Sequence, residues 1–312
     1  MSNIPIQQDG TCNGLQHYAA MGRDLEGSKE VNLIDGIKPG DLYTLVAKKV
    51  EVKVNNDKTN IESKNHLLAQ RLTFEVKRKI VKQTVMTTVY GVTYFGARAQ
   101  VRKQLKDVMS GETGEDLGNA SAYIASLTLE AVKDLFGQAH LIKDWLKGIA
   151  KISVERNEPV CWITPLGIPV IQPYRATTAT GPTLETILQR IELIPNADEE
   201  NAPVDRSKQI SAFPPNFVHS LDSTHMFFTS AKMKEKKLNF AAVHDSYWTH
   251  ACDVDIMNIE LRNEFVRLHS MPLLEELEKS MNMRFPGVYI DPIPNKGKLD
   301  LNEVKKSTYF FS

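Results

Sequence analysis

Two short strand-like segments, one near each end of the chain, constrain the fold most strongly. Residues 4–9 alternate apolar with polar or proline residues and end on Asp9, just before Gly10. Residues 239–250 read NFAAVHDSYWTH, and here an apolar run meets Asp245 before aromatic residues return. A strand that begins so early in the chain needs a hydrogen-bonding partner. We expect that partner to come from later in the sequence.

Asp245 allows two interpretations. A buried, unpaired carboxylate is costly, so the simpler one puts Asp245 at a strand end or turn, solvated or capping a backbone N–H. The other pairs it with Asp9, because two carboxylates from adjacent strands can hold Mg²⁺ together with phosphate oxygens and water. Two such ions about 3.5–4 Å apart would hold the attacking and leaving oxygens of a phosphoryl transfer. Sequence spacing alone does not bring these aspartates together.

Helical periodicity dominates between the two segments. We predict helices over residues 13–27, 38–54, 97–109, 119–153 with a break near Gly137, 217–234 with Asn216 as the N-cap, and 254–283. The segment CWITPLGIPVIQPY indicates two short strands around a turn. Residues 55–66 and 195–207 are polar and are predicted to be loops.

Composition excludes several classes of protein. The 312 residues carry 38 basic and 38 acidic side chains, so bulk charge offers no case for a nucleic-acid or membrane partner. The cysteines, Cys12, Cys161 and Cys252, have no metal-ligand spacing and suggest reduced thiols. No apolar run approaches the roughly 20 residues of a membrane helix, and no signal or transit peptide is visible. We therefore expect no membrane partner.

Residues 78–91, RKIVKQTVMTTVYG, fit a helix that ends near Gly91, although their β-branched residues also suit a strand. As a helix, they place Arg78, Lys82 and Tyr90 on one i, i+4 row. Two cations near a helix N-terminus are unfavourable unless an anion docks there, and a triphosphate would satisfy both. Tyr90 could then pack against a sugar and base. The alternative is a solvated basic start to an amphipathic helix, with Tyr90 in the core.

Five segments, in order, resemble motifs of the single-subunit, phage-type RNA polymerases of bacteriophages, mitochondria and plastids. They read DGTCNGLQHYAAMGRD, RKIVKQTVMTTVYGVTYFG, WITPLGIPVIQPYR, PPNFVHSLDSTHM and VHDSYWTHACD. The resemblance covers nearly the whole chain, and five ordered segments are far more specific than any one motif. The segment PLGIPVIQPYR resembles the mitochondrial members of the family more than the phage members, and this resemblance implies a mitochondrial location.

The resemblance implies roles for the charged residues. Asp9 resembles the first metal-binding aspartate, with the Gly10 carbonyl as a further ligand, and Asp245 resembles the second. Together they would hold two Mg²⁺ ions. Arg78 and Lys82 resemble the cations that hold the incoming triphosphate, and Lys82 also resembles the proton donor to leaving pyrophosphate.

The resemblance also implies how ribose is selected. Tyr90 resembles the tyrosine that senses the ribose 2′-OH, and His219 a histidine near the same sugar. By itself His219 would more often be a helix-surface histidine, and His244 would only shape the metal site. Related DNA polymerases carry a glutamate five residues after the first aspartate, where this chain has Gly14. The missing side chain leaves room for a 2′-OH, which favours RNA synthesis over a family A DNA polymerase.

The implied fold is a mixed α/β, hand-like polymerase. The palm would comprise residues 1–25 and 220–312, the latter with an aromatic tail, and mostly helical fingers would occupy 26–219. The implied partners are a DNA template, an RNA product, nucleoside triphosphates and accessory transcription factors. The family's promoter-binding region, thumb and first part of the palm have no counterpart here, so autonomous activity is left open.

Two other functions fit the same residues. A two-metal nuclease could use both aspartates, and a catalytically silent fragment could bind nucleic acid without extending it. Basic clusters at residues 77–82, 98–106 and 232–237 could neutralise phosphates. Each cluster also fits a solvated helix face, which we favour for the third.

Overall fold

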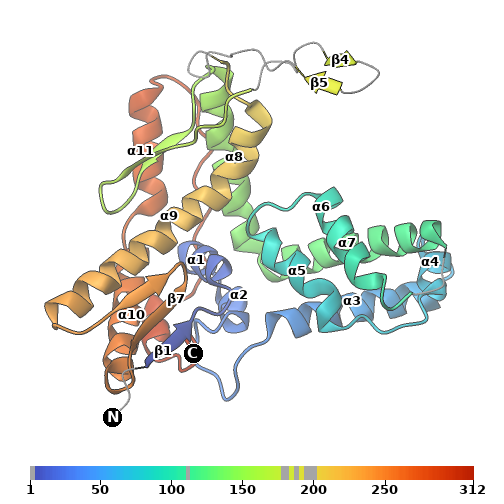
Figure 1. The fold of residues 1–312 in the computed structure, drawn as a ribbon, viewed down its shortest axis with the longest axis horizontal. Coiled ribbons are helices and arrows are strands. Elements are labelled where there is room, and N and C mark those ends of the chain that lie inside the picture. The colour runs from blue at the N-terminus through green and yellow to red at the C-terminus, as the bar shows by residue number, and fades with distance from the viewer. Residues whose placement is uncertain (1–3, 110–112, 177–182, 186–189, 193–201) are drawn as a thin grey trace.

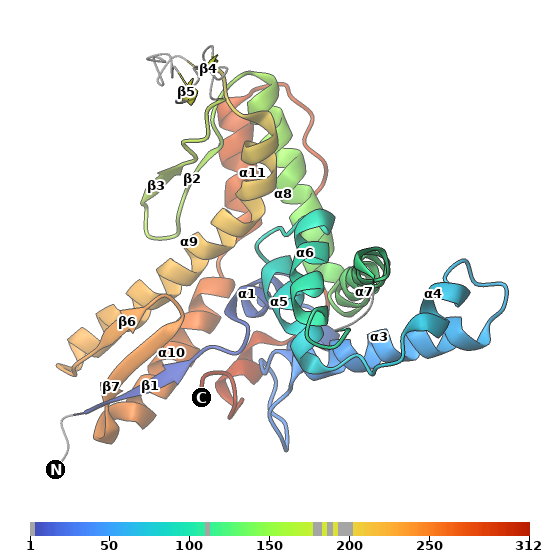
Figure 2. The ribbon, with the colours of Figure 1, turned by 45° about the vertical axis from the view of Figure 1, so that its right-hand side comes forward.

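The computed structural model describes residues 4–109, 113–176, 183–185, 190–192 and 202–312. Its many helices and small antiparallel sheets confirm the mixed α+β class. Figures 1 and 2 show a helical lobe, formed by α3 to α7, beside a second lobe that carries the sheet β1–β7–β6 and the long helix α9. Among the described residues, no helix has both the length and the apolar character needed to span a bilayer.

The elements have the following bounds. The helices are α1 (Asn13–Gly22), α2 (Leu25–Glu30), α3 (Leu42–Thr59), α4 (His66–Arg71), α5 (Arg78–Thr88), α6 (Tyr94–Leu105), α7 (Gly114–Leu135), α8 (Gly137–Glu155), α9 (Arg206–Glu235), α10 (Val254–His269) and α11 (Leu273–Arg284). The strands are β1 (Pro5–Asp9), β2 (Cys161–Ile163), β3 (Pro169–Ile171), β4 (Thr183–Glu185), β5 (Arg190–Glu192), β6 (Ala241–Val243) and β7 (Ser246–His250).

The first strand finds its partner almost at the other end of the chain, as expected. β1 pairs antiparallel with β7, and Asp9 lies opposite Ser246. β6 and β7 form a hairpin whose turn is His244–Asp245, with His244 at a left-handed φ of 54°. Asp245 therefore lies at a turn, as the simpler interpretation held, and the same turn brings it to the end of β1.

Three helix boundaries follow the sequence signals. Asp41 caps α3 by accepting a hydrogen bond from the backbone N–H of Thr44. α5 ends just before Gly91, whose φ of +76° a residue with a side chain rarely adopts. The predicted break near Gly137 is confirmed, because α7 ends and α8 begins on either side of Phe136. The predicted β2–β3 hairpin is also present.

The loop predicted over residues 55–66 is wrong in its first part, because α3 continues to Thr59. No residue there breaks a helix, and Asp57 of its last turn has two partners. It accepts hydrogen bonds from the hydroxyls of Tyr123 at 2.5 Å and Ser63 at 2.7 Å. The bond from Tyr123 joins the end of α3 to α7, and the bond from Ser63 ties it to the loop that follows.

Asn216 is not an N-cap, because α9 begins ten residues earlier at Arg206, capped by Asp205. Pro214 and Pro215 lie inside this helix, where proline usually stops a helix because it lacks an N–H donor. Both prolines are buried, and the packing around them outweighs that cost. The side chain of Asn216 instead donates to Gln172 Oε1 at 2.9 Å.

Two predicted helices are divided. The helix predicted over residues 13–27 ends at Gly22, because Arg23 adopts a left-handed φ of 54°, and α2 begins at Leu25. The single helix predicted over residues 254–283 divides into α10 and α11 at Pro272, which cannot continue the first helix. The β4–β5 hairpin was not predicted. Of the loop predicted over residues 195–207, residues 195–201 lie outside the described part of the chain.

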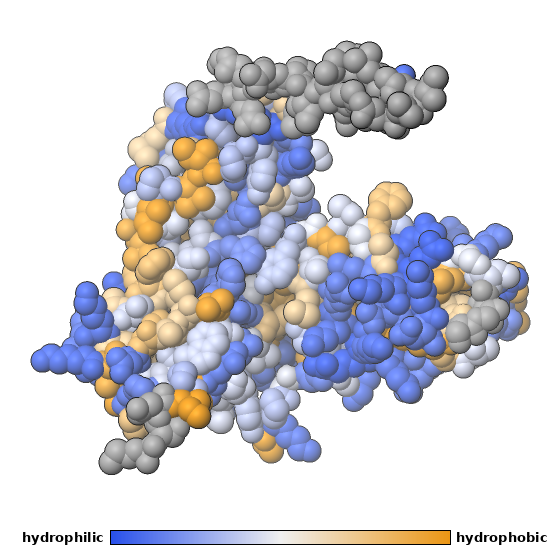
Figure 3. Space-filling view, viewed as in Figure 1, coloured by the Kyte–Doolittle hydropathy of each residue, from blue (hydrophilic) through white to orange (hydrophobic). Residues whose placement is uncertain are grey.

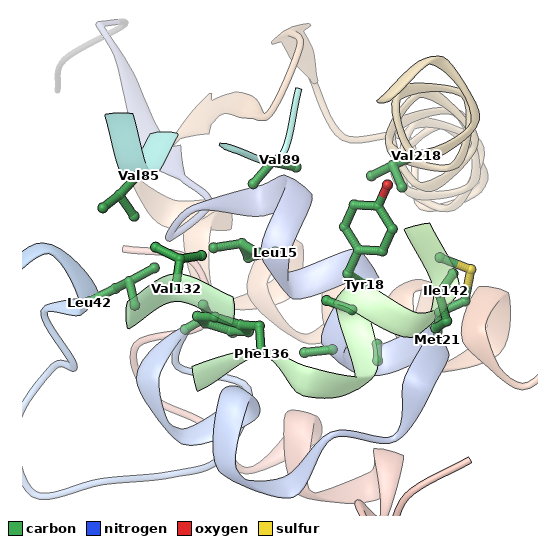
Figure 4. Packing of buried hydrophobic residues seen from close by; sticks show 14 of the residues in the cluster. Leu15, Tyr18, Met21, Leu42, Val85, Val89, Val132, Phe136, Ile142 and Val218 are labelled. Atoms are coloured by element: carbon green, nitrogen blue, oxygen red, sulfur yellow. The ribbon is translucent and has the colours of Figure 1, made fainter. Parts of the chain in front are cut away.

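Helix α1 is at the centre of the core. All of its residues are buried, and it contacts α8, α9 and α10. Figure 4 shows Leu15 and Tyr18 of α1 among side chains from α5, α7, α8 and α9. Because α1 starts directly after the Asp9–Gly10 turn, this packing fixes the position of that turn relative to the helical lobe.

Candidate active site

Asp9 and Asp245 lie at the same end of the central sheet. Gly10 N–H donates to the Asp245 backbone carbonyl at 3.2 Å, and Ser246 Oγ donates to Asp9 Oδ1 at 3.0 Å. Burial and then the negative charge of Asp9 raise the pKa of Asp245. Two neighbouring carboxylates repel each other, so a cation between them would be stabilising.

The carboxylates of Asp9 and Asp245 suit one kind of metal ion. In the described residues, no group of three or more His, Cys, Asp or Glu side chains could hold a metal ion by itself. A pair of carboxylates fits Mg²⁺, which completes its shell with phosphate oxygens and water. Zn²⁺ usually takes three or four protein ligands and fits less well.

The C-terminal residues support the Asp9 turn, and Figure 1 shows the C-terminus beside β1. Asp9 and Ser312 exchange two backbone hydrogen bonds of 3.2 Å. Phe310 and Phe311 are buried, and a Cβ atom on Gly10 would lie 3.2 Å from the Phe311 ring. The aromatic tail therefore packs against the turn that presents Asp9.

The two α5 cations lie over one aromatic ring, which sequence reasoning missed. The Arg78 guanidinium is 5.0 Å and the Lys82 Nζ 5.8 Å from the centre of the Tyr43 ring. The Tyr43 hydroxyl contacts Cys12 Sγ at 3.4 Å, two residues beyond Gly10. Both cations therefore lie toward the aspartate turn.

The two cations differ in their ionic partners. Arg78 forms a 3.1 Å ion pair with Asp41, the capping residue of α3. Lys82 has no ion pair within the described parts of the chain and is exposed. Lys82 therefore keeps its charge available for an anionic ligand, whereas Arg78 shares its charge with Asp41.

Tyr90 and His219 form a stacked pair at the mouth of a pocket. Their ring centres are 4.8 Å apart, and the planes differ by 9°. Tyr90 is 46% exposed, so its alternative placement in the core is wrong. Burial and then the Asp245 charge raise the pKa of Tyr90, which keeps its phenol protonated as a donor.

The pocket unites residues from distant parts of the sequence. It has a volume of about 330 Å³. Its lining residues are Asn13, Gly14, Tyr90, Val218, His219, Asp222, His244 and Asp245. Of the predicted residues, the pocket therefore gathers Gly14, Tyr90, His219, His244 and Asp245. Asp9 lies at the adjoining end of β1. Arg78 and Lys82 lie over the Tyr43 ring and do not line the pocket.

Asp222 is a pocket residue that sequence reasoning missed. Its carboxylate is largely buried and accepts a 2.5 Å hydrogen bond from Asn13 Nδ2. Burial raises the pKa of Asp222 to about 6. The hydrogen bond joins α9, which carries His219, to the start of α1. Its position one helical turn after His219 places it near that residue, but nothing in the sequence linked it to Asn13.

The space beside Gly14 is not open as expected. A Cβ atom on Gly14 would approach Val89 Cγ1 more closely than the 3.0 Å that real Cβ atoms essentially never breach. Glycine is needed here because α1 and the end of α5 are in direct contact. A glutamate at this position would displace Val89, the neighbour of Tyr90.

We expect Gly14→Ala to lower the free energy of unfolding by about 1–3 kcal/mol, the usual cost of overpacking. Gly148→Ala is the matched control, because its Cβ in α8 would meet nothing closer than 3.9 Å. Urea unfolding of both variants measures the difference. Val89→Ala should restore part of the stability lost by Gly14→Ala. Equal stability of the two alanine variants would contradict the contact.

Comparisons with known proteins agree along the whole chain. Residues 1–291 match a family model described as DNA-dependent RNA polymerase. The chain is 46% identical over 314 residues to DNA-directed RNA polymerase 1, mitochondrial, of Arabidopsis thaliana. It is 48% identical over 313 residues to DNA-directed RNA polymerase 3, chloroplastic, of Nicotiana sylvestris.

The chain spans different fractions of the lengths of its relatives. All of this chain aligns in each case, but it spans only 32% and 31% of those two proteins. It spans 93% of a third relative, DNA-directed RNA polymerase 2A of Nicotiana tabacum, at 46% identity. The chain thus corresponds to about a third of the longer relatives.

Proposed function

Because this chain belongs to the family of DNA-dependent RNA polymerases, we propose that it is the catalytic portion of an enzyme that adds ribonucleotides to RNA on a DNA template. The family expected from the motifs is confirmed by the match over residues 1–291. The proposal for this chain rests on one observation above all. Asp245, Tyr90 and His219 line one pocket, and Asp9 adjoins it.

In the proposed reaction, the RNA 3′-oxygen attacks the α-phosphorus of a nucleoside triphosphate, and the bond to the bridging oxygen of pyrophosphate breaks. Mg²⁺ bound by Asp9 and Asp245, with the Gly10 carbonyl as a further ligand, would supply charge neutralisation at the phosphates and acidify the attacking hydroxyl. Arg78 and Lys82 bind the triphosphate. The Lys82 ammonium donates its proton to the leaving pyrophosphate.

The stacked pair of Tyr90 and His219 selects the sugar of the incoming nucleotide. The Tyr90 hydroxyl forms a hydrogen bond with the ribose 2′-OH, a group that DNA precursors lack. Stacking on His219 at 4.8 Å restricts the Tyr90 ring to one orientation. His219 itself lies beside the same sugar.

We assign the sheet-bearing residues 1–25 and 220–312 to the palm and residues 26–219 to the fingers. The boundary falls within α9, so this continuous helix would join the two regions. Figure 3 shows hydrophilic side chains gathered over the helical lobe, which supports contact of its basic clusters at residues 77–82 and 98–106 with nucleic acid. In the third cluster, Lys232 and Lys236 pair with Glu235 and Glu260, which supports a solvated face.

The relatives' names suggest a location. One relative is named mitochondrial and another chloroplastic, so we propose an organelle without choosing between the two. DNA template, RNA product and nucleoside triphosphates are the proposed partners, with accessory transcription factors as a further possibility.

One assay distinguishes the proposed function from its rivals. The chain is incubated with a labelled RNA primer on a DNA template, ribonucleotides and Mg²⁺. A lengthened primer supports polymerase activity, whereas a shortened primer indicates a nuclease. A primer that binds but stays unchanged at every Mg²⁺ concentration indicates a silent binding fragment and contradicts autonomous catalysis.

We expect Tyr90→Phe to weaken the preference for ribonucleotides about three- to tenfold, the value of one hydrogen bond. The ring remains, so stacking on His219 is retained. The ratio of kcat/KM for a ribonucleotide and its deoxyribonucleotide measures the effect. Tyr94→Phe is the control, because that exposed tyrosine lies outside the pocket and its hydroxyl donates a hydrogen bond to the Ala122 carbonyl. An unchanged ratio in Tyr90→Phe would refute the assignment.

A further inference from the structure

A second cavity is lined by residues of α1, α7 and α8 and by the end of α5 with the residues that follow it. Its volume is about 310 Å³, within the usual range for small-molecule sites of roughly 300–1,000 Å³. Its walls are mainly apolar side chains that are themselves buried: Leu15, Tyr18, Val89, Val132, Phe136 and Ala139. Figure 4 shows Leu15, Val89, Val132 and Phe136 of this wall near one another. The cavity is an open pocket whose inner wall belongs to the core and whose rim carries exposed charged side chains such as Glu130 and Lys133.

One wall of this cavity carries a positive charge. The half-buried Lys143 lines it and donates one hydrogen bond from Nζ to the Thr88 carbonyl at 3.0 Å. An ammonium group has three donors, and Lys143 has no ion pair in the described parts of the chain. Glu130, the acidic residue at the cavity, is already paired with Lys53 at 3.3 Å. The exposed Lys133 also lines the cavity and has no ion pair in the described residues, and His140 pairs with Asp144 at 3.2 Å. The unbalanced charge at the cavity is therefore positive and comes from two lysines.

Tyr18 contributes its ring to the cavity wall but not its hydroxyl. Figure 4 shows the hydroxyl pointing toward Val218, away from Val132 and Phe136. Lys143 therefore provides the unused hydrogen-bonding capacity in the deeper part of the cavity.

We propose that this cavity binds a small aromatic monocarboxylate. The aromatic body fills the space between Phe136, Val132 and Leu15, where it is removed from water. The carboxylate accepts hydrogen bonds from Lys143, a charge-assisted interaction in a poorly solvated place. A neutral molecule of the same shape gains the apolar contacts but lacks the ionic one.

The cavity shares a wall with the candidate active site. Val89 lines it, and on its other side Val89 is in direct contact with the Gly14 backbone, which lines the active-site pocket. A ligand would therefore lie one side chain away from Tyr90. Regulation of nucleotide addition from this cavity rests on the proposed function, whereas binding itself does not.

Isothermal titration of the 312-residue chain with 2-naphthoate, and separately with the neutral 2-naphthamide, tests the proposal. We expect saturable binding of naphthoate, at least about tenfold tighter than that of naphthamide. Lys143→Met should weaken naphthoate binding about tenfold and reduce the preference for the carboxylate, to which the remaining Lys133 still contributes. Lys147→Met is the matched control, since Lys147 lies one turn further along α8, pairs with Asp144 and does not line the cavity. It should bind as the unmodified chain does.

A cavity-filling variant tests the location. Ala139→Phe places a ring inside the cavity and should abolish binding of both compounds, while a melting curve checks that the variant is folded. The proposal is overturned if the unmodified chain does not bind naphthoate, or if it binds both compounds equally. It is also overturned if folded Lys143→Met or Ala139→Phe binds naphthoate unchanged. If a variant does not fold, the comparison of the two compounds on the unmodified chain decides. Because no step of this test uses nucleotide addition, its failure is distinguishable from failure of the proposed function.

Discussion

Replacing Asp245 with asparagine is expected to reduce nucleotide addition about a thousandfold or more. The loss of about 4 kcal/mol of transition-state stabilisation corresponds to a factor of that size. Asparagine has nearly the same shape as aspartate, so the His244–Asp245 turn and the bond from Gly10 N–H to the backbone carbonyl should persist. Only the negative charge beside Asp9 is removed. Binding of an RNA–DNA duplex should therefore change little.

Primer extension beside a duplex-binding titration measures both parts of this prediction. Mn²⁺ binding in the presence of a nucleoside triphosphate, followed by electron paramagnetic resonance, adds a readout that does not require turnover. Asp255→Asn is the control, because this exposed aspartate lies in the first turn of α10 and outside the pocket. Extension by Asp245→Asn at the original rate, or unchanged Mn²⁺ binding, would refute the metal role.

Lys82→Met is expected to slow nucleotide addition roughly a hundredfold, the lower end of the usual contribution of a general acid. Lys82 is free of ion pairs in the described structure and lies over Tyr43, whereas Arg78 is bound to Asp41. Lys82→Arg keeps the positive charge but is a poor proton donor, because guanidinium does not release its proton readily. We expect Lys82→Arg to retain nucleotide affinity while losing most of the rate.

Rapid-quench measurements of rate against nucleotide concentration separate these two effects. Lys79→Met is the matched control, because Lys79 lies on the same helix and pairs with Asp107 on another side. An equal loss of rate in Lys79→Met and Lys82→Met would show only a general electrostatic effect of α5. A lowered affinity with an unchanged maximal rate in Lys82→Met would restrict Lys82 to binding.

Local signals predicted the elements that depend on neighbouring residues. Asp41 and Gly91 marked the start of α3 and the end of α5, because capping and positive φ are properties of a few adjacent residues. Prediction failed where distant contacts decided the outcome. Buried packing overrides two prolines within α9, and hydrogen bonds from Tyr123 and Ser63 hold the polar end of α3.

The candidate site shows the same division. Arg78, Lys82 and Tyr90 could be grouped from one helical row, because their spacing is local. Asp41 and Tyr43, which hold the two cations, and Asp222, which joins α9 to α1, gave no such signal. Their partners are remote in sequence, so only their positions in space identify them.

The sequence by itself determined the family and the class of fold, and it nominated the side chains proposed to carry chemistry, since these depend on ordered motifs and local periodicity. Only the tertiary structure decided that Asp9 and Asp245 share one sheet end and that Tyr90 stacks on His219. It also decided that Val89 fills the space beside Gly14. The physical reason is that strand pairing and core packing join residues far apart in the chain, and their strength depends on the whole core rather than on any one segment.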